Sequence, residues 1–115
     1  MNEYQERNPL IKEQQKKFLL LLGYNYLKSN KLEKSVIIFK ALYHLYPDID
    51  IFCLCLSYIY LKLNNYEDTL FYAEIYLTNR KGKLKQGRLI KSKALFALGL
   101  VDEAKECARK IYDTK

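Results

Sequence analysis

The sequence predicts an all-α protein built from three consecutive helix-turn-helix units, and three observations indicate this. Apolar residues recur along the chain at the three- and four-residue spacings of one helix face, while the two-residue alternation of strands is scarce. Glycine and proline, with 4 and 2 residues in 115, are too few for a turn-rich β-sandwich. A set of small and large residues also returns every 34 or 35 residues, the period of a stacked helical repeat.

Turn-forming residues divide the chain into six expected helices. Pro9 suits the first position of the first helix, with Asn8 as its cap. Pro47 ends the second helix, and Asp48 is expected to cap the third. The connections are short, so consecutive helices should lie antiparallel. The expected helices span residues 10–29, 31–46, 48–63, 66–79, 84–98 and 101–113.

Three frames of the sequence match one another in register. They begin at Lys16, Asp50 and Lys85, and so follow each other at spacings of 34 and 35 residues. Small residues at shared positions allow helices to approach closely, and large residues fill the space beside them. The small residues are Gly23, Ser35, Ser57, Thr69 and Ala104, and the large ones are Tyr26, Phe39 and Tyr60.

This pattern resembles that of tetratricopeptide-repeat (TPR) proteins, W-x2-L-G-x2-Y, A-x3-F and a closing P over 34 residues. The resemblance implies a TPR superhelix of three helix-turn-helix repeats. A single TPR domain would span 1–115, with an N-terminal extension over 1–15 and repeats at about 16–49, 50–84 and 85–115. The second and third repeats depart from the family in lacking the closing proline. Three repeats are about the minimum for a stable stack.

In that family the first helix of each repeat lines a concave binding face. The lining positions here carry Lys17, Leu20, Tyr24, Leu27, Ile51, Leu54, Tyr58, Leu61, Gln86, Leu89, Lys93 and Phe96, and we expect all but Lys17 and Gln86 to bind a partner. The first helices are apolar nearly all round, so they need cover on every side. An apolar helix or extended peptide of a partner would provide it. The alternatives are the ends of this chain or a second copy, as a homodimer without cargo.

The net charge of +7 is concentrated in one segment. Arg80 to Lys93 holds seven basic residues and no acid, while the rest of the chain is balanced. Helical spacing places Lys93 toward the groove and Lys91 outside it. The segment is interpreted as a solvated loop and helix start, as a contact for an acidic protein surface, or as a nucleic-acid site. Aromatic residues that would stack bases do not interleave it, so we expect no nucleic acid partner.

The remaining composition argues against an enzyme or a cofactor site. His44 is the single histidine and has no nucleophile or acid at useful spacing. Cys53, Cys55 and Cys107 are expected to be small buried hydrophobes in a reducing compartment, and the first two point apart on a helix, so a metal site is not expected. The longest apolar runs fall short of the ~20 residues of a membrane span. We therefore expect a cytoplasmic protein without direct membrane insertion.

Two stretches resemble a narrower family. The run from Glu13 to Gly23, EQQKKFLLLLG, and the run from Ile38 to Pro47, IFKALYHLYP, are similar to the SctY (YscY) family of bacterial type III secretion chaperones. The resemblance implies a non-enzymatic chaperone that forms a heterodimer with a small early-secreted protein, SctX (YscX). The chaperone would hold an apolar helix of SctX in its groove and deliver it from the bacterial cytoplasm to the export gate SctV at the inner membrane.

Other functions stay open from the sequence alone. A chaperone of the needle subunit would differ only in its cargo. A general TPR peptide-binding adaptor would instead rely on basic clamps such as Lys17, Arg88 and Lys93, and an RNA-binding protein would use residues 80–93. For the groove we expect charged residues at Tyr58 and Leu61 to abolish co-purification of the partner without unfolding the stack.

Overall fold

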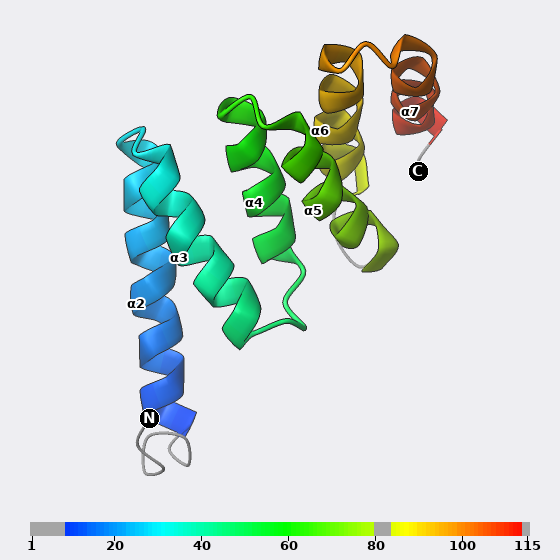
Figure 1. Ribbon diagram of the computed structural model, residues 1–115. Coiled ribbons are helices and arrows are strands. Elements are labelled where there is room, and N and C mark those ends of the chain that lie inside the picture. Colours follow the sequence, from blue (N-terminus) through cyan, green and yellow to red (C-terminus); the bar gives the residue numbers. More distant parts are fainter. Residues whose placement is uncertain (1–8, 80–83, 114–115) are drawn as a thin grey trace.

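The computed structural model describes residues 9–79 and 84–113, and the described chain is all-helical (Figure 1). The predicted all-α class is confirmed. Each predicted helix is present, with ends that differ by up to three residues. Asn8 and residues 80–83, including three basic residues of the expected basic segment, lie outside the described residues. The helices are α2 (Pro9–Lys28), α3 (Leu32–Leu45), α4 (Ile51–Lys62), α5 (Tyr66–Asn79), α6 (Leu84–Ala97) and α7 (Val101–Asp113).

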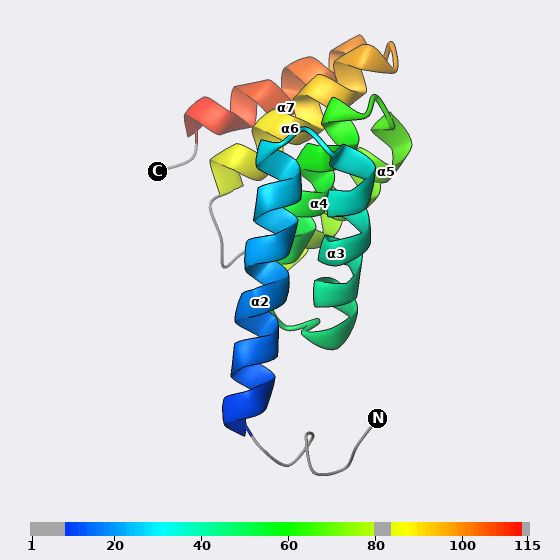
Figure 2. The same cartoon turned by 90° about the vertical axis from the view of Figure 1, so that its left-hand side faces the viewer.

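The helices form three hairpins, α2–α3, α4–α5 and α6–α7, which stack in chain order. Each helix packs on the next one, and α4 also packs directly on α6. The three hairpin turns lie along one edge of the stack (Figure 1). Seen from the side, α6 and α7 run across the direction of α2, so the stack twists along its length (Figure 2). The result is an elongated body of 52 × 30 × 20 Å.

The three hairpin turns share one backbone geometry. Asn30, Asn64 and Gly99 have φ values of 59°, 62° and 85°, and they follow each other at the predicted spacings of 34 and 35 residues. At each turn this residue donates its N–H to the carbonyl three residues back, and the next residue donates to the carbonyl five residues back, at 2.8–3.1 Å. This arrangement satisfies carbonyls that a helix end leaves open. The sequence repeat is therefore also a repeat of local structure.

The predicted small residues do lie where helices cross closely. A Cβ atom placed on Gly23 would lie 3.0 Å from both Ile38 Cγ2 and Phe39 Cε2. The Ser35 hydroxyl donates to the Gly23 carbonyl at 3.1 Å, which ties α2 to α3. The remaining members of the set are buried as well, namely Ser57, Thr69 and Ala104. Close contact within each hairpin thus depends on side chains of minimal size.

The apolar core forms three clusters along the stack. The largest joins α3 and α4 through residues such as Phe39, Leu42, Phe52 and Leu56. The second joins α4, α5 and α6, and includes Tyr76 and Ile90. The third, smallest cluster holds α6 against α7. Since each hairpin buries apolar surface against its neighbour, the stack is stabilised as a series of adjacent interfaces.

The expected cap at Asp48 is wrong. The helix begins at Ile51, Asp50 occupies the cap position, and neither its side chain nor that of Asp48 makes a capping hydrogen bond. Residues 47–50 instead form a turn in which the Ile49 N–H donates to the Tyr46 carbonyl at 3.1 Å. Ile49 packs against the largest core cluster. Burial of this side chain favours a turn over two further residues of helix.

Candidate functional site

A hollow of about 340 Å³ opens between the first helices of the three hairpins. We call it the groove. Six of the ten predicted binding residues line it, namely Leu27, Leu54, Tyr58, Leu61, Leu89 and Lys93, and Gln86 lines it too. These residues come from α2, α4 and α6, three helices far apart in the sequence. The structure therefore brings the central part of the predicted set together.

The other four predicted residues do not line this hollow. Leu20, Tyr24, Ile51 and Phe96 are all exposed, by 42%, 52%, 45% and 66%. Phe96 and Lys93 instead border a second hollow between α6 and α7. The reason lies in how the helices pack, because α4 contacts α6 directly while α2 packs chiefly on α3. Leu20 and Tyr24 therefore remain exposed on the upstream part of α2.

Two lining residues, Cys55 and Ile90, were missed. Both stand at the sixth position of their repeat frames, where the first frame has Leu21, which is also exposed. A shared apolar position across the three frames was the signal that could have revealed them. Burial raises the pKa of the Cys55 thiol to about 11, so the thiol stays neutral at physiological pH and adds to the apolar lining.

The groove has a closed floor and an open rim. Leu54 and Ile90 lie in the floor and belong to the second core cluster, with exposures of 9% and 8%. Tyr58 and Leu89 stand at the rim with 42% and 46% of their surface exposed. A ligand that entered the groove would contact the rim side chains first and remove their apolar surface from water.

Lysine side chains lie over tyrosine rings on α2 and α4 in a repeated arrangement. The Lys62 ammonium lies over the Tyr58 ring, 5.5 Å from its centroid. One repeat earlier, the Lys28 ammonium lies 5.4 Å from the centroid of the Tyr24 ring. In the third repeat, Lys93 occupies the position equivalent to Tyr24 and Tyr58. Its own side chain therefore places a cation at the groove. Such cation–π contacts hold a flexible lysine near the ring.

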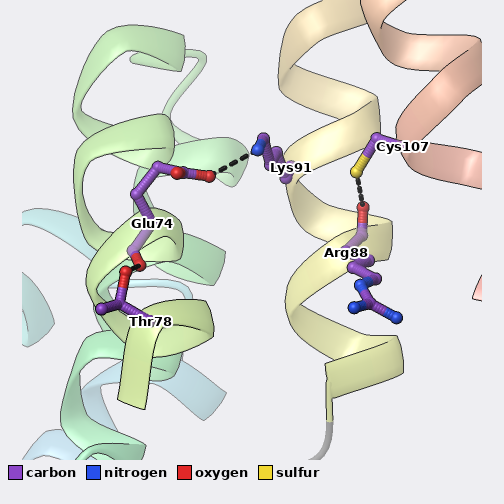
Figure 3. Close-up of polar contacts among 5 residues, drawn as sticks. All are labelled: Glu74, Thr78, Arg88, Lys91 and Cys107. Atoms are coloured by element: carbon purple, nitrogen blue, oxygen red, sulfur yellow. Dashed lines mark hydrogen bonds and ion pairs between the residues drawn. The ribbon is translucent and has the colours of Figure 1, made fainter. Parts of the chain in front are cut away.

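Two basic residues of α6, Arg88 and Lys91, lie away from the groove. A cleft of about 520 Å³ between α5, α6 and α7 contains both of them and Glu74. Lys91 pairs with Glu74 at 2.5 Å, and the Cys107 thiol donates to the Arg88 carbonyl at 3.3 Å (Figure 3). The Arg88 guanidinium donates to the Lys110 carbonyl at 3.3 Å. Arg88 thus binds α7 and does not line the groove, unlike a peptide clamp.

The cysteines and the histidine show no catalytic arrangement. Cys53 and Cys107 are buried, Cys55 is half-buried, and all three are free thiols. His44 lies exposed on α3. Within residues 9–79 and 84–113, no cluster of metal-ligating side chains is present, and no helix is long and apolar enough to cross a membrane.

No family model matches this chain, and no curated protein matches it.

Proposed function

We propose that this protein is a TPR-type chaperone of bacterial type III secretion that holds an apolar helix of a small early-secreted, SctX-like partner. The single observation that carries the proposal is the groove. Six predicted residues on three separate helices converge on one apolar hollow. The repeated turn geometry at intervals of 34 and 35 residues supports the tetratricopeptide assignment.

An apolar helix suits this groove for physical reasons. The rim side chains of Tyr58 and Leu89 are about half exposed, and so are those of Leu20 and Tyr24 on α2. Burying apolar surface yields roughly 25 cal/mol per Å². A partner helix that places its residues at i, i+3, i+4 and i+7 along the groove would cover these side chains in succession. The partner in turn would have its own aggregation-prone face covered.

The cargo and the destination come from the family resemblance. The stretches Glu13 to Gly23 and Ile38 to Pro47 resemble the SctY family, and these stretches form most of α2 and α3. The proposed complex is a heterodimer in the bacterial cytoplasm, from which the SctX-like cargo is delivered to the export gate SctV. The same groove could hold a needle subunit, and the identity of the retained cargo separates these two chaperones.

The test is retention of a co-expressed SctX-like protein by a groove variant. Leu61 packs on the second core cluster, so a charge there would also disturb folding. We therefore pair Tyr58→Glu with Leu89→Glu, since both side chains are exposed at the rim. The matched control is Ile37→Glu with Phe71→Glu, two exposed apolar side chains on the second helices.

The groove variant is expected to lose the partner by at least about tenfold in retained amount, because charges would be buried against an apolar helix. The control variant should retain it, and both should keep the helical circular dichroism of the parent. Equal retention by both variants would show that the partner binds elsewhere.

A further inference from the structure

Charge is divided between the two kinds of helix in this stack. The first helices of the hairpins, α2, α4 and α6, hold nine basic residues and a single acid, Glu13. The second helices, α3, α5 and α7, hold eight acidic and five basic residues. The set of helices that lines the groove therefore carries the excess of basic residues.

Two ammonium groups border the groove without a carboxylate partner, and a third has the equivalent place one repeat earlier. Lys93 lines it, Lys62 lies over the lining residue Tyr58, and Lys28 has the same position over Tyr24. No carboxylate is among the lining residues. None of these three lysines takes part in an ion pair within the described chain. Lys16 and Lys91 differ, since they pair with Glu13 and Glu74.

We propose that the segment held in the groove is an amphipathic helix of another protein whose apolar face is bordered by carboxylates. Lys28, Lys62 and Lys93 would pair with these carboxylates while the apolar face covers the rim. This inference rests on the proposed function and adds the chemistry of the partner. Charge complementarity of this kind fixes the register of a bound helix and disfavours basic competitors.

A second copy of this chain is a poor occupant. Two grooves placed face to face would bring together two linings that each contain Lys93 and no carboxylate. The acidic helix α5 of a second copy could enter the groove either reciprocally, which closes a dimer, or head to tail, which produces a ring or a growing assembly. Oligomeric state therefore separates a second copy from a heterologous partner.

The test uses three synthetic peptides of about 18 residues, long enough to form a helix. Each carries the same leucine stripe, bordered by Glu, by Gln or by Lys. Binding to the full chain is measured by fluorescence anisotropy. The Glu peptide is expected to bind about tenfold more tightly than the Gln peptide at low salt, with the Lys peptide weakest. The difference should shrink at physiological salt.

Two double variants test whether the lysines at the groove cause the preference for the Glu peptide. Lys62→Glu with Lys93→Glu is expected to abolish the preference for the Glu peptide. The matched control, Lys31→Glu with Lys34→Glu, makes the same charge change at the start of α3 and should preserve the preference. Thermal melting checks that both variants remain folded.

The outcomes separate this inference from the proposed function. Equal binding of the Glu and Gln peptides, with both lost in Tyr58→Glu/Leu89→Glu, would contradict a partner helix bordered by carboxylates. It would still support the apolar groove as the binding site. Binding of all peptides that is unaffected by that variant, or no binding at all, would overturn the groove itself. Concentration-dependent oligomers of the parent that disappear in Lys62→Glu/Lys93→Glu would make a second copy the occupant.

Discussion

At the scale of single residues, glycines decide how closely neighbouring helices approach. The sequence pattern predicted a close approach at Gly23, which lies inside the first repeat frame. Gly87 is a second such residue and was not predicted. A Cβ atom there would lie 2.8 Å from Tyr76 Cδ2 and 2.9 Å from Leu77 Cδ2. This contact joins α6 to the preceding hairpin, so only the tertiary structure reveals it.

Gly87→Ala is expected to destabilise the protein. Overpacking typically costs about 1–3 kcal/mol, and the gain in helix propensity returns up to about 1 kcal/mol. Tyr76 is only 1% exposed and has little freedom to move aside. Urea unfolding should give a lower free energy of unfolding for Gly87→Ala than for the parent. The loss should be smaller for Gly23→Ala, because the added Cβ atom there would lie 3.0 Å from its nearest neighbours. A Gly87→Ala protein more stable than the parent would contradict the observed packing.

The raised pKa values of the cysteine thiols lead us to expect a loss of stability at alkaline pH. Burial raises the pKa of Cys55 to about 11, and burial also raises the pKa values of Cys53 and Cys107. Between about pH 9 and pH 11 the folded chain keeps a proton that the unfolded chain has released, so unfolding is favoured as the pH rises. Urea unfolding at several pH values should show this fall, with a shallower slope for Cys55→Ala. Parallel slopes would contradict the assigned burial of this thiol.

At the scale of elements, the hairpin turns explain why the helix boundaries could be predicted. Asn30, Asn64 and Gly99 are residue types that tolerate positive φ, and each stands at a break expected from the sequence. The link between α3 and α4 was predicted less well. Proline and aspartate there suggested a cap, but the chain forms a turn in which Ile49 packs against the core. Local signals therefore located the turns that depend on backbone conformation and missed the one that depends on packing.

The turn geometry gives a paired prediction at Asn30, whose φ is 59°. Glycine adopts this conformation without a steric cost, whereas alanine does not. Asn30→Gly should leave the free energy of unfolding unchanged or raise it, and Asn30→Ala should lower it, with about 1 kcal/mol between the two variants. Thermal and urea unfolding measure the difference. The reverse order would contradict the left-handed conformation at this turn.

At the scale of the whole molecule, the stack separates charge in a way that the linear sequence conceals. Basic first helices alternate along the chain with second helices whose acidic residues are concentrated in α5 and α7, so a sequence window averages the two. From the sequence, the excess charge was concentrated in Arg80 to Lys93. The structure divides the described part of that segment, because Lys93 borders the groove while Lys91 pairs with Glu74.

The candidate site was predictable to the extent that it follows the repeat. Positions on α4 and α6 converge because those helices pack directly, and their rim residues Tyr58 and Leu89 line the groove. Leu20 and Tyr24 lie beyond the hollow because α2 packs chiefly on α3. The repeat pattern predicts which face of each first helix lies toward the binding surface. The spacing between hairpins depends on core packing, and the repeat pattern does not predict that packing.

Site-specific photo-crosslinking tests whether the partner lies in the groove. A photoreactive phenylalanine analogue replaces Tyr58 at the groove rim or Ile37 on α3 in cells that co-express the SctX-like protein. Binding in the groove predicts a covalent adduct of the mass of one chaperone and one partner from position 58, and none from position 37. An adduct from position 37 alone, or adducts of equal yield from both positions, would contradict binding in the groove.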